Sequence, residues 1–150
     1  MSCIAAACAW FEWMRIHPLF EKADGLTSQI IGAAIDVHRD KGPGLVEPIY
    51  EWCFLKELEL RRLATETQRS VVITYKGFTR ETPLRFDVLV EQWVLVEAKA
   101  VECTLPIHQA QLLSYMKLLD VPVGLLINFN VTKLTAGVTR LTLPTTNKPD

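Results

Sequence analysis

The sequence has few cysteines and no long apolar run, and each absence excludes a class of protein. Its four cysteines are Cys3, Cys8, Cys53 and Cys103. They form no Cys-x-x-Cys pair and have no partner run of histidines, which disfavours a zinc module or a disulfide framework. The apolar stretches, such as residues 121–129, fall short of the roughly 20 residues that a bilayer span requires. We therefore expect a protein with reduced thiols and no transmembrane segment, located in the cytoplasm.

An excess of charge of one sign is also missing. The chain has 16 Lys and Arg against 17 Asp and Glu, for a formal net charge of -1. A protein that binds nucleic acid through its overall field needs many surplus cations, so any such contact must be local. The segment from Lys56 to Arg85 has seven basic and four acidic residues. This excess is compatible with a phosphate-facing surface or with a solvated helix face.

The length of 150 residues suits one domain. Residues 1–26 are expected to be an amino-terminal extension of uncertain structure, because small apolar residues and aromatics follow one another there without a clean period. A short extra helix, a partner-binding arm or a start upstream of Met14 are open alternatives, whereas the flanking residues disfavour a signal peptide. Residues 27–143 form the regular domain, and residues 144–150 form a frayed tail.

Periodicity within the regular domain predicts three helices and five strands. The first helix starts at Thr27 or Ser28 and stops before Gly42, the second runs from Glu47 to about residue 62, and the third covers residues 106–119. The predicted strands are residues 71–75, 84–90, 93–100, 123–129 and 138–143. The order is two helices, three strands as a meander, one helix and two strands.

Strand parity brings acidic and basic residues together. Glu97 and Lys99 share one face of the strand 93–100, because successive side chains point to opposite faces. An odd-length turn centred on Gln92 would place Asp87 directly across from Glu97, with the valines of both strands on the other face. A two-residue turn would mix charges into that valine face. Burial therefore favours the first register.

Two carboxylates that face each other within roughly 5 Å repel, and at a half-buried position they stay ionised only if a cation lies between them. Oxygen ligands of this kind suit Mg2+ or Mn2+. Lys99 would lie beside the ion, where its charge can hold an attacking water or a phosphate oxygen. These groups suit phosphodiester hydrolysis. The alternative is an ordinary salt bridge between Glu97 and Lys99 or Arg85.

Four blocks of sequence resemble a known family. The runs RFDVLV (residues 85–90) and VEAKA (96–100) resemble the D...E-x-K core of the PD-(D/E)xK nuclease superfamily, although Phe86 stands where the superfamily has its proline. GPGLVEPIY (42–50) resembles the G-x-x-E-x-x-Y signature of the small GxxExxY family. The resemblance continues through HQAQLLSY (108–115) and GLLINF (124–129), so it covers about residues 26–143.

The resemblance implies an α/β fold with a restriction-endonuclease-like αβββαβ core, in which a mixed central sheet is flanked by helices. It implies that Asp87 and Glu97 are metal ligands and that the main-chain carbonyl of Ala98 is a third. Glu47 would extend from the early helix toward the metal or its waters.

The resemblance also assigns Lys99 as the catalytic lysine and directs Gln111 toward Lys99 or the scissile phosphate. Tyr50, His108 and Tyr115 are candidate accessory residues. The Tyr50 hydroxyl could bond the carboxylate one helical turn before it, or the ring could be a core aromatic with a solvated tip. His108 could approach the site or cap its helix.

The expected function is that of a nuclease that depends on Mg2+ or Mn2+ and acts on DNA or RNA. The alternative is a nuclease-fold module that binds nucleic acid or a protein without turnover. A homodimer through the amino-terminal arm or the edge formed by residues 123–143 is a further open possibility.

Overall fold

The computed structural model describes residues 17–143. Its elements are α2 (Phe20–Lys41), α3 (Glu47–Leu60), β1 (Thr65–Tyr75), β2 (Phe78–Val90), β3 (Val94–Lys99), α4 (Pro106–Leu119), β4 (Val123–Asn128), a 3-10 turn η1 (Leu134–Gly137) and β5 (Val138–Thr142). This order of helices and strands confirms the predicted one, and α4 has the predicted bounds. None of the helices in the described part is both long and apolar enough to cross a membrane.

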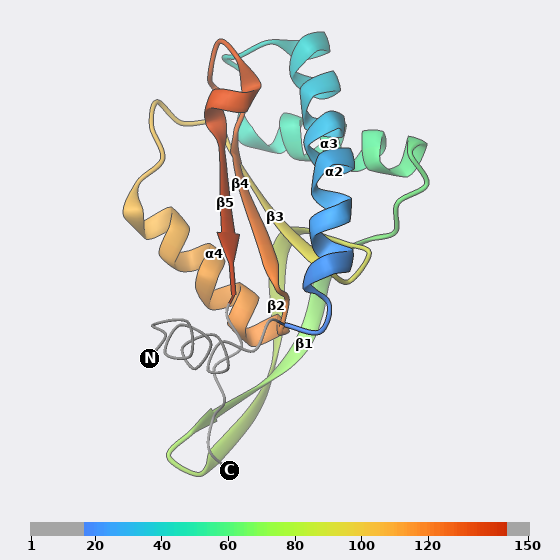
Figure 1. Ribbon diagram of the computed structural model, residues 1–150. Coiled ribbons are helices and arrows are strands. Elements are labelled where there is room, and N and C mark those ends of the chain that lie inside the picture. Colours follow the sequence, from blue (N-terminus) through green and yellow to red (C-terminus); the bar gives the residue numbers. More distant parts are fainter. Residues whose placement is uncertain (1–16, 144–150) are drawn as a thin grey trace, which may run out of the picture.

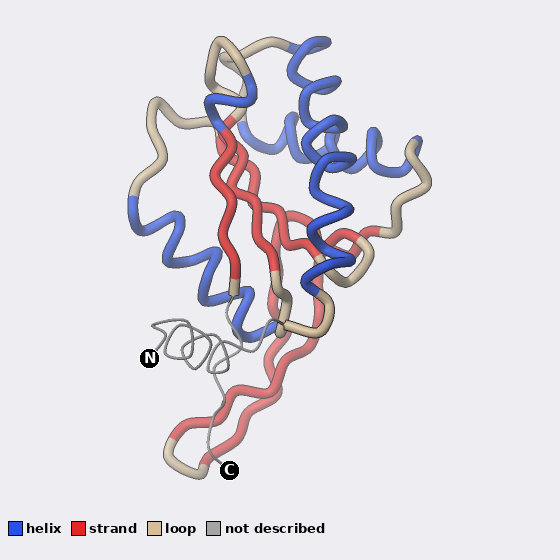
Figure 2. Tube along the Cα trace, in the orientation of Figure 1, coloured by secondary structure: helices blue, strands red, loops and turns tan. Residues whose placement is uncertain are grey.

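The strands form one mixed sheet in the order β1-β2-β3-β4-β5. β3 and β4 run parallel, and the other neighbouring strands run antiparallel. Figures 1 and 2 show α2 and α3 on one side of the sheet and α4 on the other. The predicted α/β architecture, a mixed sheet flanked by helices, is confirmed.

Each sheet face carries its own core. The valines of β2 and β3 pack with α2 and α3, whereas Leu89 and Leu95 pack with α4. Val90 pairs with Val94 and Val88 with Val96, so the connection has three residues centred on Gln92. The predicted odd-length turn and its valine face are confirmed, and the two-residue alternative is excluded.

The predicted start of the first helix at Thr27 or Ser28 is wrong. α2 begins at Phe20, and Ala23 and Leu26 are buried with the rest of its apolar face. A helical glycine costs up to about 1 kcal/mol, and burial of these two side chains offsets that cost at Gly25. A domain boundary at residue 27 would therefore fall inside a helix. The predictions for residues 1–16 and 144–150 lie outside the described residues.

The hairpin of β1 and β2 is longer than predicted, because β1 starts at residue 65 and β2 at residue 78. Lys76 and Gly77 close it with positive φ angles of 47° and 85°. Two such residues give the turn twist that matches a long antiparallel hairpin. The additional strand residues are mostly polar or exposed, so apolar alternation did not predict them.

Candidate active site

An irregularity in β2 surrounds Asp87. Glu66 of β1 pairs with Leu89, but Gln68 pairs with Arg85, so residues 86–88 of β2 lie opposite Thr67 alone. The burial pattern changes at the same point. Phe86 packs on the α4 side, whereas Val88 packs on the side of α2 and α3. Such bulges often re-aim a side chain near an active site.

At this irregular point of β2, the Asp87 side chain bonds the backbone of β3. Its Oδ2 atom accepts a hydrogen bond of 2.7 Å from the N–H of Ala98. The register would place Asp87 opposite Glu97, as expected, but paired residues end at Val88 and Val96. The expectation of a regular ladder through Asp87 is therefore wrong. The two strands separate there, and the carboxylate occupies the gap.

β3 supplies the buried acid and the lysine. Glu97 is only 8% exposed although it is charged in its ordinary state. The Lys99 Nζ atom lies 3.4 Å from Glu97 Oε1 and 3.9 Å from Glu47 Oε1. Lys99 thus bridges the acid of its own strand and an acid of α3. The salt bridge named as the alternative exists, and it is part of a larger cluster.

α3 adds two carboxylates on one helical face. Glu47 and Glu51 are four residues apart, so they project from neighbouring turns. Carboxylate oxygens of Glu47, Glu51 and Asp87 lie within 4.8 Å of one another. The sequence reasoning singled out Glu47 and missed Glu51. The spacing of four residues from a candidate ligand was the signal that could have identified it.

Burial and crowding perturb these acids. Burial, with the negative charge of Asp87 as the next cause, raises the pKa of Glu97 to about 7, although Lys99 opposes the shift. Burial and then Asp87 raise the pKa of Glu51 to about 7 as well. Burial also raises the pKa of Asp87, against the hydrogen bond from Ala98. The cluster therefore has more negative charge than Lys99 alone compensates.

A divalent cation fits this donor set. Carboxylate oxygens are the ligands that Mg2+, Mn2+ and Ca2+ prefer. The carboxylate oxygens of Glu47, Glu51 and Asp87, within 4.8 Å of one another, are the residues that would hold such an ion. A dication would also offset the burial and the repulsion that raise the pKa values of Glu51, Asp87 and Glu97.

Tyr50 has a structural position. It is fully buried, its ring stacks on Phe129 with centroids 4.7 Å apart, and its hydroxyl donates to the Gly42 carbonyl. The same hydroxyl accepts a bond of 3.1 Å from the Leu45 N–H. It bonds the loop before α3 rather than the carboxylate of Glu47. The core-aromatic interpretation is correct, and Tyr50 fixes the chain just ahead of the acidic residues.

The contacts found for the candidate residues on α4 in the described part of the chain do not include the carboxylates. His108 caps the helix start, where its Nδ1 atom accepts a bond of 3.0 Å from the Leu105 N–H. Tyr115 is half-buried against the α4-side core. Gln111 is exposed, and no hydrogen bond within residues 17–143 joins it to Lys99. The roles of Gln111 and Tyr115 stay predictions.

Asn128 was not among the predicted site residues, yet it fixes the end of β3. It is buried at the end of β4, opposite Lys99. Its side-chain amide donates to the Val101 carbonyl and accepts from the Val101 N–H, at 2.8 and 3.1 Å. The Phe129 N–H donates to the Lys99 carbonyl at 2.8 Å. These bonds hold the backbone at the lysine and just after it.

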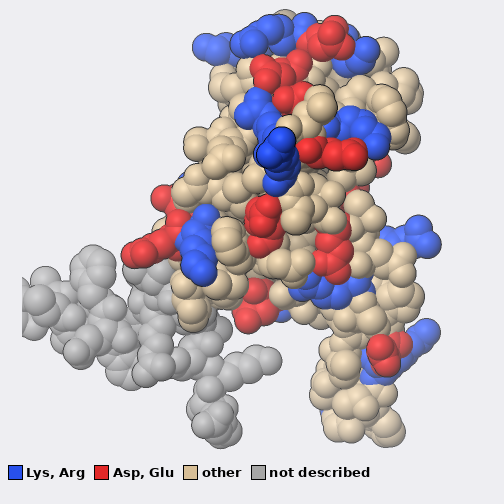
Figure 3. All heavy atoms as spheres, turned by 90° about the vertical axis from the view of Figure 1, so that its right-hand side faces the viewer, with Lys and Arg blue, Asp and Glu red and all other residues tan. Residues whose placement is uncertain are grey.

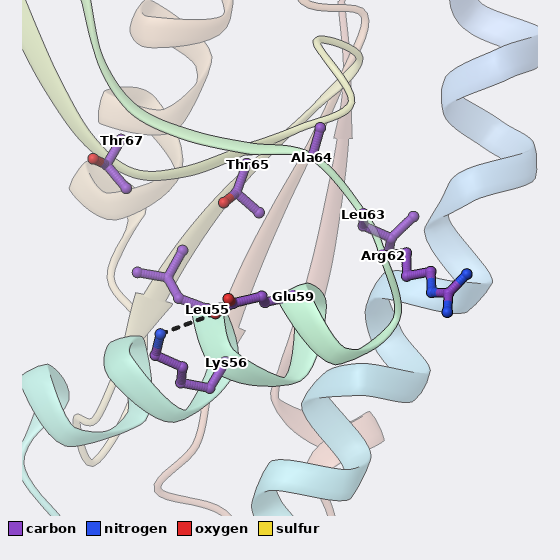
Figure 4. Close-up of a pocket in the computed structure, with 8 residues that line it drawn as sticks. All are labelled: Leu55, Lys56, Glu59, Arg62, Leu63, Ala64, Thr65 and Thr67. Carbon is purple, nitrogen blue, oxygen red and sulfur yellow. Dashed lines mark hydrogen bonds and ion pairs between the residues drawn. The ribbon is translucent and has the colours of Figure 1, made fainter.

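A pocket of about 560 Å³ lies further along α3. Leu55 lines both this pocket and the small cavity beside Glu51 and Asp87. Figure 4 shows the larger pocket, in which Lys56 is paired with Glu59 and the Arg62 side chain points away from the other lining residues. Among the described residues, Arg62 is thus the one lining cation without an ion pair, and it is directed away from the rest, so the pocket does not gather positive charge for an anionic ligand. Figure 3 shows basic and acidic side chains interspersed on this side of the molecule.

The mixed sheet flanked by helices, with four acids and a lysine where β2 and β3 separate, is that of a restriction-endonuclease-like fold. The chain belongs to the PD-(D/E)XK nuclease superfamily, whose family model matches residues 24–141. The superfamily is described as one of nucleases.

A solved structure, "Crystal structure of SSO0001", is similar with a TM-score of 0.50 and 18% sequence identity. The match covers 82% of this chain and 61% of that one, so the present chain spans less than two thirds of that protein. At this identity the likeness supports the fold alone. No curated protein matches the sequence.

Proposed function

We propose that the protein is a divalent-metal-dependent nuclease that hydrolyses phosphodiester bonds in DNA or RNA and uses Mg2+ or Mn2+. One observation carries the proposal: carboxylates from α3, β2 and β3 and the ammonium group of Lys99 meet where β2 and β3 separate. Isolated acids buried in this way are costly. A bound divalent cation would provide the missing counter-charge, and the phosphate of the substrate would then contact that cation.

The proposed ligands are Asp87, Glu97, the Ala98 carbonyl and Glu47, with Glu51 added. The N–H of Ala98 already bonds Asp87. In an extended strand the carbonyl of a residue leaves from the same edge as its N–H, which supports a carbonyl oxygen directed toward Asp87. The proximity of Glu51 to Asp87 supports its inclusion.

When bound, a divalent cation supplies positive charge to a phosphate oxygen and acidifies a nearby water. Lys99 is proposed to stabilise the charge that develops on the phosphate oxygens, because two carboxylates hold its ammonium group inside the cluster. Gln111 is proposed to approach the scissile phosphate from α4, where its amide is exposed. His108 and Tyr115 stay accessory candidates on the same helix.

Membership of the GxxExxY family is also part of the proposal. Gly44, Glu47 and Tyr50 are spaced as in its signature, and the local geometry of Gly44 and Tyr50 supports the proposal. Gly44 has a φ of 100°, which few other residues adopt. Tyr50 ties the loop to its own helix. The signature thus fixes the geometry in which Glu47 starts α3.

The test measures metal binding and cleavage separately. Calorimetry with Mg2+ and Mn2+ should show binding that Asp87→Ala removes. Cleavage of single- and double-stranded DNA and RNA should be lost in Asp87→Ala and should fall by about 100-fold or more in Lys99→Ala, while Lys99→Ala still binds the ion.

Lys117→Ala, which removes an exposed lysine of α4, is the matched control and should leave both readouts unchanged. Absence of any metal binding at these carboxylates would refute the proposal. Nucleic-acid binding without turnover in either metal would favour a non-catalytic binding module instead.

A further inference from the structure

The turn end of the β1–β2 hairpin extends beyond the two cores, whereas Val71, Ile73 and Leu84 nearer its base still pack on the α4 side. We call residues 71–85 the distal hairpin. Its strands pair from Val71 with Thr82 to Tyr75 with Phe78, at the turn. Figure 1 shows it projecting away from the helices. The proposed reaction leaves this segment without an assigned role.

One face of the distal hairpin combines aromatic rings with cations. Tyr75 and Phe78 are 67% and 77% exposed, and their pairing places them on the same face. Arg80 pairs with Ile73, two residues along each strand, so it shares that face. Lys76 Nζ lies 5.3 Å from the centre of the Tyr75 ring.

The one acidic residue of the distal hairpin, Glu81, does not lie on the face that carries the aromatic rings. Glu81 pairs with Val72 on the opposite face, and it accepts a hydrogen bond of 2.8 Å from the Ser70 hydroxyl. Residues 71–85 contain Lys76, Arg80 and Arg85 against this one acid. The aromatic face therefore presents positive charge only, whereas the chain as a whole is nearly neutral.

These features select one occupant among the candidates. A second copy packed symmetrically on this face would bring Lys76 and Arg80 of both copies together, and like charges oppose such a contact. A nucleic-acid strand supplies phosphates for the cations and flat bases for the rings. Unpaired bases are required, because bases stacked inside a duplex present no free ring face.

We propose that the distal hairpin binds unpaired nucleotides of the strand that enters the carboxylate site. Bases stack on Tyr75 and Phe78, and phosphates contact Lys76 and Arg80. The substrate class rests on the proposed nuclease function. Asp87 follows Phe78 by nine positions in β2, which is about 30 Å at the rise of a strand. A strand that keeps a stacked spacing of about 3.4 Å per nucleotide must therefore span about nine nucleotides to contact both places.

The test measures fluorescence anisotropy of labelled single strands of about 6 and about 30 nucleotides, in DNA and RNA, with EDTA present to prevent cleavage. The double variant Tyr75→Ala/Phe78→Ala should bind the long strand at least about fivefold more weakly. Lys76→Gln/Arg80→Gln should lower the slope of log K against log salt by about 1.4. In EDTA the carboxylate site should not bind the short strand in any of these proteins, because its uncompensated acids repel phosphates.

Matched controls are Trp52→Ala, which removes an aromatic of α3 that is 62% exposed, and Lys117→Gln. Both should bind the long strand like the wild type. Because the replaced hairpin side chains are exposed, we expect each variant to stay folded, and circular dichroism checks this.

The inference is overturned if the aromatic variant binds the long strand like the wild type, or if the wild type binds no strand. A concentration-dependent dimer that only the hairpin variants lose, seen by light scattering, also overturns it in favour of a contact between copies. Cleavage by the wild type in Mg2+ is scored separately. Hairpin-dependent binding without cleavage refutes the nuclease alone, and cleavage with binding that ignores the hairpin refutes this inference alone.

Discussion

The substitution Glu97→Gln should stabilise the metal-free protein at neutral and higher pH. Burial and the charge of Asp87 raise the pKa of Glu97 from 4.5 to about 7, so the folded state holds a proton on this group more tightly than the unfolded chain does. The stability due to that proton is fully present below pH 4.5 and is lost as the pH rises through 7. A shift of this size corresponds to about 3 kcal/mol.

Gln resembles the protonated acid in shape and charge. Wild type and Glu97→Gln should therefore have similar free energies of unfolding at pH 4.5 in EDTA. At pH 8 the variant should be more stable by up to about 3 kcal/mol, which raises Tm by roughly 6 to 12 °C in a chain of this size. Saturating Mg2+ should reverse the order, because the ion stabilises only a site that binds it.

Urea unfolding followed by circular dichroism at both pH values, with EDTA or Mg2+, measures these differences. Glu102→Gln, which removes an exposed carboxylate from the loop after β3, is the control and should show little difference between the two pH values. A Glu97→Gln protein that is destabilised equally at pH 4.5 and pH 8 in EDTA would show that the ionised acid is not a source of strain.

Three further substitutions test the parts around the cluster. Glu51→Gln should weaken Mg2+ binding in calorimetry, because its carboxylate lies with that of Asp87 in the proposed ligand set; unchanged affinity would remove it from that set. Tyr50→Phe should cost about 1 to 2 kcal/mol in urea unfolding, since it breaks two hydrogen bonds to the loop before α3, and should weaken metal binding without abolishing it. Gly124→Ala should cost about 1 to 3 kcal/mol, because a Cβ atom would lie 2.5 Å from Met116 Sδ; a wild-type Tm would show that α4 moves away freely.

The register of the central strands was predictable because burial depends on it. A slip of one residue between β2 and β3 would move every valine to the wrong face, so the valine pattern alone selected the pairing of Val88 with Val96. The elements near it, α3 and α4, were predictable for the same reason and from their prolines at the first turn. Periodic burial is strongest in the centre of the fold, and prediction was best there.

The local environment of the acids was not predictable from periodicity. Parity assumes a regular strand, and β2 is irregular at residues 86–88. No turn residue marks this bulge, which follows from the fit of β2 to β1. Glu51 was missed because a helical acid has no signal of its own until the neighbouring sheet brings Asp87 near it. The start of α2 was missed because Gly25 interrupts a face that Ala23 and Leu26 continue.

The distribution of charge argues that metal and substrate are coupled at the site. Glu47, Glu51, Asp87 and Glu97 stand against Lys99 there, so without a dication the site repels a phosphate. The near-neutral total charge then excludes only binding through the overall field. A short strand should bind the carboxylate site only when Mg2+ is present, whereas a long strand should retain part of its affinity in EDTA through the distal hairpin. Equal dependence on Mg2+ for both lengths would mean that the hairpin contributes no binding of its own.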